Sequence, residues 1–565
     1  MQVLIIGGYG TFGFRIAERL SDEPELELVL AGRNLDKATT ACSKLSGAAN
    51  FTPLKLDRNT IDLSVKPDLI IDASGPFQAY KGSPILDYCL THGIHYADLS
   101  DDGGFVSAVL DQNSRAKTAD IVAVSGSSTC PVLSAIGLRE IETKIGPANE
   151  VMIGIAPSPK ADLGRNVVTA VTLYAGQKTV PTMRHGKQIL VAGLTEIQNA
   201  TICVPGETPL PRLPFAVADA PDAKVLPHSF INLTDIWTGA GTRPVWMHRL
   251  LVTLSRGVAK GSLPKLGPLA DVFHRSRAFF RFGEHRGGMI VYAKNSSDAA
   301  SWHLVADGDH GPFIPTLPAV ALVRKFLRQA PPAPGAYSGD QIVDLKSLAP
   351  EFAELDVTYG MQYDGADLPV YEGVMGDAYL RLSPAVQDLH GTGSGRVFSG
   401  LCKVTRGKNP LSHIVAAFIG FPKSGENVPV SVTVTPDETG ESWTRNFGGR
   451  TFTSHHSSGT GRWSRHVTER FGPISIHMAI LEESGNLRIH TKGWSIFGIP
   501  LPKVLRPGGD VYETQDTEGR FVFHVDLIAP LFGRLCKYHG WLEPVENAGA
   551  KEISPSGSGS PQTSA

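Results

Sequence analysis

Short apolar runs alternate with amphipathic stretches over the first 140 residues. Residues 3–6 form an uninterrupted apolar run, which is typical of a strand buried on both faces of a parallel sheet. The next stretch places Phe12, Ile16 and Leu20 on one helical face. Because alternating strands and helices pair in parallel through right-handed crossovers, the pattern predicts a doubly wound α/β Rossmann domain over residues 1–140. Further strands are predicted at 26–31, 51–56, 69–73, 94–98 and 121–124, and a helix at 83–92.

The middle of the chain, residues 141–350, mixes strand and helix patterns. Six prolines between residues 204 and 227 exclude a regular helix there and indicate a long surface excursion. The basic, aromatic segment 273–282 is more typical of a half-buried helix, with contact to a membrane surface as the alternative. We therefore expect a second, α+β domain on the substrate side that ends near a proline-rich segment. Its predicted strands are 150–156 and 170–173, its helices 246–256 and 315–328, and the proline-rich segment 330–335.

Residues 351–545 change to short alternating or β-branched runs separated by Gly, Pro and Asp. These runs predict an antiparallel, β-rich domain in which residues 411–421 form the one clear helix. A sheet curled around an apolar cavity would take a hydrophobic ligand; a scaffold or dimerisation domain is the alternative. The tail at 546–565 is rich in Ser, Gly and Pro and is expected to be disordered. The runs lie at 428–434, 474–481, 487–492 and 521–527.

The overall composition is that of an ordinary globular protein. The chain has 565 residues, of which 42% are hydrophobic and 19% charged, so we expect about three domains. Its formal net charge of −2 argues against a nucleic-acid binder with a large basic surface. No uninterrupted apolar window of about 18 residues predicts a transmembrane helix. The N-terminus lacks the basic region of a signal peptide, so we expect a cytoplasmic protein.

The cysteines and histidines carry no metal-binding signature. Six cysteines occur without a CxxC pair, which argues against a disulfide framework and against a thiolate zinc site. Arg445 and Glu469, which have aromatic neighbours in the sequence, are candidates for a buried ion pair. The histidines of the C-terminal third lack the spacing of a compact ligand set, and they are His455, His456, His466, His477 and His490. No metal is therefore predicted.

A glycine-rich loop joins the first predicted strand to the first helix. The segment 7–13 reads GGYGTFG and fits either GxGxxG or GxxGxxG. Glycines let the backbone approach a pyrophosphate closely, and the N-terminus of the following helix favours an anion. A glycine pattern alone is weak, but the strand–loop–helix context makes this one specific. We therefore predict a dinucleotide site that includes Gly7, Gly8, Gly10, Thr11, Phe12 and Gly13.

The end of the second predicted strand indicates which dinucleotide binds. A fold that selects NAD places Asp or Glu near this point, where it binds the ribose hydroxyls. Here Arg33 stands 20 residues after Gly13, and a guanidinium can bind a 2′-phosphate through charge-assisted hydrogen bonds. NADP is therefore favoured over NAD, with a solvated surface arginine as the alternative. The remaining cofactor-binding candidates follow successive strands and are Asn34, Asp57, Ser74, Gly75, Pro76 and Phe77.

Three motifs in this region carry a resemblance to a known family. They are Gly75-Pro76-Phe77-x-x-Tyr80, His95-Tyr96-x-Asp98 and Ser125-Gly126-x-x-x-x-Pro131. Together with the glycine loop they resemble the saccharopine-dehydrogenase-like NADP-binding oxidoreductases over about the first 140 residues, and the resemblance returns at 286–336. It implies a Rossmann domain, an NADP cofactor and a second sheet-based domain that closes over a cleft.

The C-terminal third carries a second resemblance. Motifs such as Trp443-x-Arg445-x-Phe447 resemble, over about 385–545, a bacterial domain of unknown function that often follows the saccharopine-dehydrogenase-like domain. This resemblance implies no activity. Saccharopine itself is not favoured as the substrate, because the cations that would bind a tricarboxylate are dispersed along the chain: Arg139, Lys160, Arg165 and Arg184.

A nicotinamide cofactor carries the hydride, so the protein must position the substrate and move a proton. The catalytic candidates near the turn at 75–77 are Tyr80, Tyr96 and Asp98, with His95 as a further one; a tyrosine would donate the proton and Asp98 would orient it. Each of these residues has a purely structural alternative.

We expect an NADP-dependent oxidoreductase that transfers a hydride to or from an unidentified carbonyl, imine or enoyl substrate. This substrate would be a small molecule, which could be hydrophobic. Two alternatives stay open: a non-catalytic NADP-binding sensor, and a protein that binds a lipid or other hydrophobic ligand. Peripheral membrane contact and a homodimer also stay open.

Overall fold

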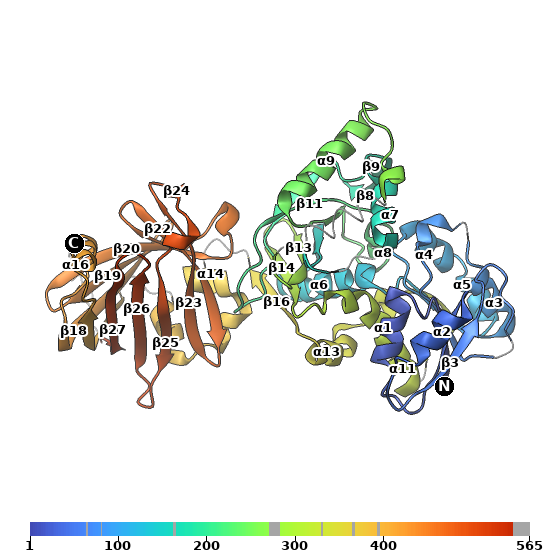
Figure 1. Cartoon of the computed structure of the whole chain (residues 1–565), viewed down its shortest axis with the longest axis horizontal. Helices are drawn as coiled ribbons and strands as arrows, with labels where there is room; N and C mark the ends of the chain where they lie inside the picture. The colour runs from blue at the N-terminus through green and yellow to red at the C-terminus, as the bar shows by residue number, and fades with distance from the viewer. Residues whose placement is uncertain are drawn as a thin grey trace, which may run out of the picture. The chain divides into compact units, whose positions relative to one another are not determined.

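The computed structural model describes residues 1–545 with gaps at 64–65, 81, 162–164, 271–282, 329–330, 364–367 and 392–395. The chain forms two compact units (Figure 1). The first comprises Met1–Leu368, Gly373–Tyr379 and Gly459–His466, and the second Pro369–Glu372, Leu380–Ser458 and the residues from Val467 onward. The domain boundaries predicted at 140 and 350 stay predictions. The basic segment 273–282 and the tail 546–565 lie outside the described residues.

A seven-stranded sheet of parallel pairs forms the N-terminal part of the first unit, in the order β15-β6-β5-β4-β1-β2-β3. The order reverses at β1, as in doubly wound folds. This confirms the predicted Rossmann domain. The seventh strand, β15, comes from far along the chain and pairs with β6. The strands are β1 (Gln2–Ile6), β2 (Glu27–Gly32), β3 (Asn50–Lys55), β4 (Leu69–Asp72), β5 (His95–Asp98), β6 (Val122–Ser125) and β15 (Gly335–Ser338).

Helices cover both faces of this sheet. Val3 and Ile5 belong to one buried cluster, with side chains of α1, α6 and α11, whereas Leu4 and Ile6 belong to another, with α3, α4 and α5. Successive side chains of a strand point to opposite faces, so an unbroken apolar run fills both clusters. The helices are α1 (Thr11–Arg19), α2 (Leu35–Cys42), α3 (Pro84–His92), α4 (Gly103–Leu110), α5 (Asn113–Thr118), α6 (Thr129–Ile145) and α11 (Leu317–Arg328).

A mixed sheet of nine strands forms the rest of the first unit. Its main path is β10-β11-β12-β7-β13-β14-β16, and β8 and β9 join through β12. Helix α6 packs on this sheet, where a Cβ at Gly137 would lie within 3 Å of Val291 and Trp302. The strands are β7 (Glu150–Ala156), β8 (Lys178–Arg184), β9 (Lys187–Ala192), β10 (Ile197–Ala200), β11 (Leu213–Val217), β12 (Asp235–Ala240), β13 (Gly287–Lys294), β14 (Ala299–Ala306) and β16 (Val357–Tyr363).

Two predictions for this region are wrong. Residues 170–173 belong to helix α7 (Arg165–Tyr174), in which Val168 and Thr172 are buried at helical spacing. The proline-rich stretch 204–227 is not a surface excursion, because β11 is buried throughout and α8 (Asp222–Ser229) follows it. Strand β12 pairs with β11 only at Ala216 and Val217. Pro214 lies outside this paired part, so its missing N–H costs no hydrogen bond between β11 and β12.

The other predicted helices are confirmed with small shifts at their ends. Helices α3, α9 (Val245–Ala259), α11 and α16 (Pro410–Ile419) lie where the sequence predicts them. The further helices are α12 (Gly339–Ile342), α13 (Leu345–Glu354), α14 (Val370–Met375) and α15 (Pro384–His390). Among the described residues, no helix is long and apolar enough to cross a membrane.

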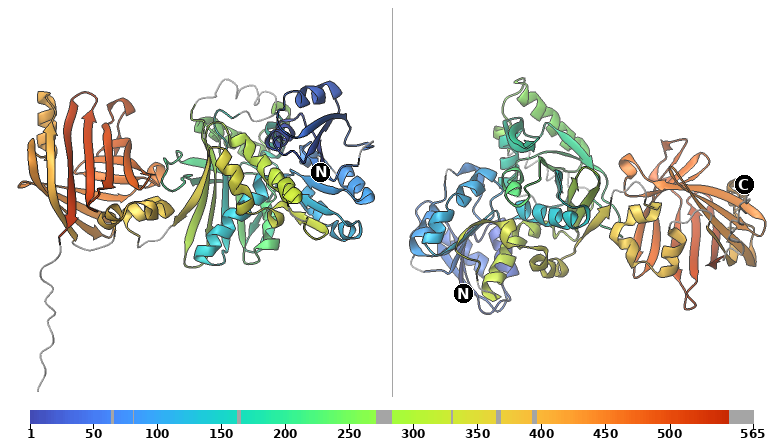
Figure 2. Two further views of the ribbon diagram at one scale, coloured as in Figure 1. Left: turned by 90° about the horizontal axis from the view of Figure 1, so that it is seen from below. Right: turned by 180° about the vertical axis from the view of Figure 1, so that it is seen from behind.

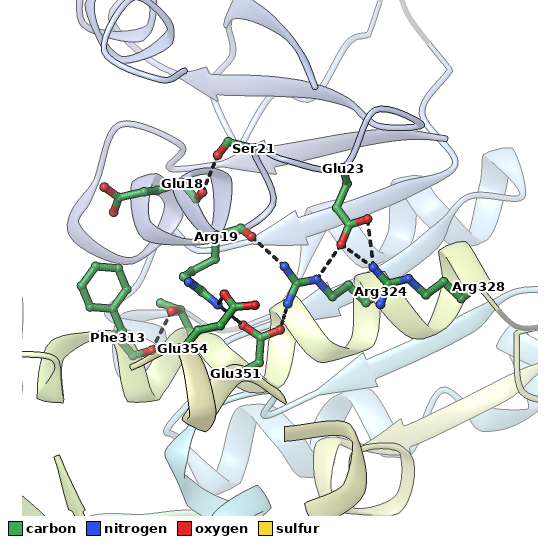
Figure 3. Close-up of polar contacts among 10 residues, drawn as sticks. Glu18, Arg19, Ser21, Glu23, Phe313, Arg324, Arg328, Glu351 and Glu354 are labelled. Carbon is green, nitrogen blue, oxygen red and sulfur yellow. Dashed lines mark hydrogen bonds and ion pairs between the residues drawn. The ribbon is translucent and has the colours of Figure 1, made fainter. Parts of the chain in front are cut away.

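An ion-pair network joins α1 to α11 and α13 (Figure 3). Glu351 of α13 is 1% exposed and contacts the guanidinium groups of Arg19 and Arg324. Arg324 also donates to Glu23 at 2.7 Å, and Glu23 accepts a further hydrogen bond from Arg328 at 2.8 Å. The network therefore fastens the first helix of the chain to helices that come more than 300 residues later.

The second unit is a closed antiparallel barrel (Figures 1 and 2). Its eleven strands follow the order β22-β21-β20-β19-β18-β17-β27-β26-β25-β23-β24, and β22 also pairs with β23, which closes the ring and leaves β24 outside it. The predicted β-rich domain is thus confirmed. The strands are β17 (Arg396–Arg406), β18 (Gly425–Asp437), β19 (Gly440–Phe447), β20 (Arg450–Ser458), β21 (Val467–Phe471), β22 (Ile474–Glu483), β23 (Asn486–Ile496), β24 (Ile499–Pro500), β25 (Gly508–Gln515), β26 (Phe521–Ala529) and β27 (Gly533–Pro544).

Candidate functional site

The glycine loop lies between β1 and α1, at the carboxyl edge of the parallel sheet. Gly7 has a φ of +81°, and the N–H groups of Gly7 and Gly8 donate to the carbonyl of Ala31 at 2.9 and 3.0 Å. A Cβ at Gly13 would lie 2.4 Å from the Gly7 oxygen, and one at Gly8 would lie 2.9 Å from the Leu30 Cα. Close packing of backbone on backbone therefore excludes side chains at these positions, as a pyrophosphate-binding loop requires.

The N-terminus of α1 has no side-chain cap. Gly10 occupies the N-cap position, and Thr11, Phe12 and Gly13 form the first turn, which carries no acidic residue. The first N–H groups of a helix and its dipole favour an anion at this point. The backbone of residues 7–13 thus fits the pyrophosphate of a dinucleotide.

The end of β2 brings Arg33 and Tyr9 to the same edge. Arg33 is exposed, and the N–H of Asn34 donates to the Tyr9 hydroxyl at 3.2 Å. The Tyr9 ring covers Gly32 so closely that a Cβ there would lie 2.4 Å from it. Asn34 also caps α2 through its side chain, which accepts from the N–H of Lys37 at 2.9 Å. Tyr9 is a residue that the sequence analysis missed, because its position inside the glycine motif is variable.

The turn after β4 is held by a buried charge pair. Asp72 is fully buried and accepts a hydrogen bond from Arg58 at 2.8 Å, while Ser74 donates to the same carboxylate through its N–H and its hydroxyl. The guanidinium of Arg58 lies 3.4 Å from the ring centre of Tyr80, whose hydroxyl donates to the Ser74 carbonyl at 2.7 Å. These contacts shape the turn that contains Gly75, Pro76 and Phe77. Phe77 itself is buried in the hydrophobic cluster that contains Leu4 and Ile6.

Asp57 lies two residues after the end of β3, and its carboxylate makes a hydrogen bond within the following turn. Its carboxylate accepts the N–H of Asn59 at 3.0 Å. It lies one strand beyond Arg33, since β3 is the neighbour of β2 at this end of the sheet. Its part in cofactor binding stays a prediction.

The catalytic candidates Tyr96 and His95 lie on β5, within the parallel sheet. Tyr96 is fully buried, and burial, followed by the charges of Asp98 and Asp72, raises the pKa of its hydroxyl well above the ordinary value. His95 accepts the N–H of Val122 at 3.0 Å, and burial lowers the pKa of its ring. Both residues therefore have clear structural contacts, and a catalytic role of Tyr96 stays a prediction.

Asp98 ties the end of β5 to the end of β6. One carboxylate oxygen accepts the N–H groups of Ser100 and Gly126, both at 2.9 Å, while the other oxygen is buried and accepts no hydrogen bond from the residues that the structure describes. Burial raises the pKa of Asp98 to about 6, although the backbone hydrogen bonds act in the opposite direction. The carboxyl group is thus protonated over a wider pH range than an exposed aspartate.

A group of acidic side chains from both sheets gathers beyond the end of β5. Asp101 follows β5, is exposed, and accepts a hydrogen bond from Gln78 at 3.0 Å. Asp219 follows β11; burial, and then the charges of Asp102 and Asp101, raise its pKa to about 7. Burial, and then the charges of Asp219 and Asp101, raise the pKa of Tyr174. Sequence reasoning could have found Asp101, which lies three residues after the end of a predicted strand, whereas only the fold brings Asp219 and Tyr174 close to it.

The barrel of the second unit contains a separate buried polar cluster. Arg445 and Glu469 form the predicted ion pair, with 3.4 Å between nitrogen and oxygen, and the Ser454 hydroxyl donates to Glu469 at 2.7 Å. Glu469 also pairs with His456 at 2.9 Å. Burial alone would raise the pKa of Glu469, but the charges of His456 and Arg445 lower it to about 2. The described residues hold no cluster of His, Cys, Asp and Glu that could bind a metal ion.

The comparisons with known proteins match the two ends of the chain. Residues 3–124 match the saccharopine dehydrogenase NADP binding domain, and residues 382–542 match a domain of unknown function, DUF4166. The comparison with curated proteins gives no significant match. The first match supports a dehydrogenase-type oxidoreductase with a nicotinamide dinucleotide cofactor.

Solved structures of dehydrogenases resemble the chain at low sequence identity. Saccharopine dehydrogenase (L-Glu forming) from Saccharomyces cerevisiae shares 10% identity over 64% of this chain and 100% of its own, with a TM-score of 0.44. A myo-inositol dehydrogenase from Corynebacterium glutamicum shares 10% identity over 53% of this chain and 74% of its own, with a TM-score of 0.25. From the family matches, the chain carries a saccharopine dehydrogenase NADP-binding domain at its N-terminus and a DUF4166 domain towards its C-terminus.

Proposed function

We propose that the protein is an NADP-dependent oxidoreductase that transfers a hydride to or from a small carbonyl, imine or enoyl substrate. The observation that carries the proposal is the glycine loop, in which a Cβ at Gly8 or Gly13 would collide with backbone while α1 offers an uncapped N-terminus. When bound, the cofactor supplies the hydride donor or acceptor. The residues of the chain bind it, orient the substrate and move the accompanying proton.

Arg33 is the residue that would select NADP. It is exposed at the end of β2, the position where NAD-selective folds place a carboxylate, and its guanidinium suits bidentate hydrogen bonds to a 2′-phosphate. Tyr9 covers the adjacent Gly32 and would form one wall beside the ribose. Asn34, Asp57 and the turn at 75–77 stay the predicted remainder of the cofactor site.

We assign the proton transfer to Asp219. A general acid or base works best when its pKa lies near the working pH, and the pKa of Asp219 is raised to about 7. Its carboxyl group lies near Asp101 and Tyr174, beyond the end of β5, and open α/β sheets bind their ligands at this edge. The catalytic roles predicted for Tyr80, Tyr96 and Asp98 stay predictions; each of these residues also makes local contacts at the turn or the strand ends.

The test is nucleotide binding to the full-length protein, measured by calorimetry with NADPH and NADH. The wild type should prefer NADPH by at least tenfold, and Arg33→Ala should lose that preference because the 2′-phosphate loses its partner. Lys44→Ala removes the same charge from an exposed site just beyond α2 and serves as the matched control. Absence of binding by either nucleotide at millimolar concentration would refute the oxidoreductase.

A substrate screen follows if NADPH binds. With any substrate that turns over, Asp219→Asn should lower kcat at least a hundredfold while NADPH binding is retained, because general acid–base catalysis contributes about 10²–10⁴-fold. An unchanged kcat would exclude Asp219 as the proton carrier. Tight NADPH binding without turnover of any candidate would instead favour the non-catalytic sensor.

A further inference from the structure

The two ends of the C-terminal barrel differ in their chemistry. The register of the strands assigns every connection to one end or the other; for example, Phe447 pairs with Arg450 at one end and Asp437 with Gly440 at the opposite end. We call the first of these the apolar end. It is formed by the connections 407–424, 448–449, 472–473, 497–507 and 530–532, which join β17 to β18, β19 to β20, β21 to β22, β23 to β25 and β26 to β27.

Large hydrophobic side chains are exposed at the apolar end. Phe497 is 81% exposed and Val504 75% exposed, which is unusual for side chains of this size in water. Both belong to the connection 497–507, which contains β24 (Figure 1), and other connections at the same end of the barrel add further exposed hydrophobic side chains. The exposed hydrophobic residues of these connections and of the adjoining strand end are Leu411, Ile414, Phe497, Ile499, Val504, Ile528 and Leu531.

The backbone at Phe497 adds a second observation. Phe497 and Gly498 are the two central residues of the turn between β23 and β24, and both have positive φ, +50° and +77°. Such turns favour Asn or Gly at the first position, and a bulky side chain in this conformation is strained. The chain thus places an aromatic residue where exposure and backbone geometry both disfavour it. Folding does not account for this choice, whereas a partner that takes up the ring does.

The charges at the apolar end are all positive. None of its five connections contains Asp or Glu, whereas they contain Lys408, Lys423, Lys503 and Arg506. The carboxylates nearest to these connections on the strands are Glu426, Glu469, Asp510 and Asp526, and each is paired with a cation, which is Lys403, Arg445, Arg488 and Arg534 respectively. Turns at the opposite end carry carboxylates instead, among them Asp437, Glu438, Glu482, Glu483, Asp516 and Glu518.

We propose that the apolar end of the barrel docks on the surface of an anionic lipid bilayer. Exposed aromatic and aliphatic side chains would enter the interface between headgroups and acyl chains, while lysine and arginine side chains bind the anionic headgroups. This surface is independent of the proposed nucleotide site. A second copy of this chain fits less well, because a two-fold contact would bring the cations of one apolar end against those of the other.

Co-sedimentation of the full-length protein with vesicles tests the proposal. The protein should pellet with vesicles of phosphatidylcholine and phosphatidylglycerol at a ratio of 3:1, and at least tenfold less with phosphatidylcholine alone. Raising the salt from 0.1 to 0.5 M should weaken binding several-fold, since headgroup attraction is screened. Failure of the wild type to bind anionic vesicles at low salt would overturn the proposal.

The variant Phe497→Asn combined with Val504→Ser separates docking from folding. Asn tolerates positive φ, so this change should keep or raise the melting temperature while lowering vesicle binding at least tenfold. Leu380→Ser, at a side chain of the same unit that is 72% exposed outside the apolar end, is the matched control and should bind like the wild type. Vesicle binding that survives the double variant would refute docking through this end. A wild-type dimer that the double variant abolishes, without vesicle binding, would identify a second copy as the partner instead.

Discussion

At the scale of single residues, the glycines of the nucleotide loop act by excluding side chains. A Cβ at Gly13 would lie 2.4 Å from the Gly7 oxygen and 2.9 Å from the Gly8 Cα, so the loop and α1 cannot keep their present distance. Gly13→Ala should lower the stability by about 1–3 kcal/mol through overpacking, and NADPH affinity at least tenfold. Thermal unfolding and calorimetry measure the two effects.

Gly82→Ala is the control for this prediction, since a Cβ there meets no described atom within 4 Å. It should unfold and bind nucleotide like the wild type. Wild-type affinity in Gly13→Ala would show that the loop can open without cost, and the fit of the loop to a pyrophosphate would then fail as an argument.

Asp98 gives a pH-dependent prediction at the same scale. Its pKa is raised from 3.8 to about 6, so the folded state retains a proton that the unfolded chain loses. The stabilisation is fully present below pH 3.8 and is lost as the pH rises through about 6, and it amounts to about 3 kcal/mol. Asp98→Asn cannot titrate, so its melting temperature should fall less between pH 4.5 and pH 8 than that of the wild type. Equal falls in the two proteins would contradict the assignment.

At the scale of elements, the ion-pair network of Figure 3 decides how firmly α1 is held against α11 and α13. Glu351 is buried between Arg19 and Arg324, whereas Glu354, which also pairs with Arg19, is 59% exposed. Glu351→Gln removes the negative charge that pairs with the partly buried guanidinium groups of Arg19 and Arg324. It should therefore lower the free energy of unfolding of the first unit by about 1–3 kcal/mol. Glu354→Gln should change it by less than about 1 kcal/mol, because exposed pairs contribute little.

Thermal unfolding of the two variants side by side checks this prediction. Equal effects would mean that the buried carboxylate does not anchor the helices. The comparison keeps charge and side-chain size matched, so only the difference in burial separates the two changes.

Elements whose signal is local could be predicted from the sequence. The run at residues 3–6, the glycine loop and the helix after it were predictable because a buried parallel strand needs an unbroken apolar run and a phosphate loop needs glycine. Arg33 and the turn at 75–77 could be predicted for the same reason, because they come soon after the predicted strands 26–31 and 69–73. The helix α7 was missed because the β-branched pair Val171 and Thr172 resembles a strand, although Val168 and Thr172 are buried one helical turn apart.

Elements that depend on distant pairing could not be predicted. The four residues of β15 follow a proline-rich segment and carry no strand signal, yet they add to the sheet beside β6. Asp219 and Tyr174 reach the proposed proton-transfer site only because the second sheet brings them near Asp101. The pairing of β17 with β27, the first and last strands of the barrel, likewise joins segments that are distant in sequence and follows from no local pattern.

At the scale of the whole molecule, the first sheet is completed by β15, a strand that follows most of the second sheet in sequence. A fragment of residues 1–140 would lack β15 and α11, so the edge of β6 and part of the cluster around α1 would be exposed. We expect this fragment to show no cooperative thermal transition and to bind a hydrophobic dye. Calorimetry and dye fluorescence check this; a sharp transition with NADPH binding would show that 1–140 is an independent domain.

The late return of β15 also sets an order of events during protein synthesis. When the ribosome has made β6, the sheet still has an open edge, and the missing strand is translated only after most of the second sheet. At about 5–20 residues per second, the roughly 210 residues in between take on the order of ten seconds or more. For that time the nascent chain exposes an unpaired strand edge. The chain therefore depends, while it is being made, on the folding of the second sheet or on chaperones to prevent aggregation at β6.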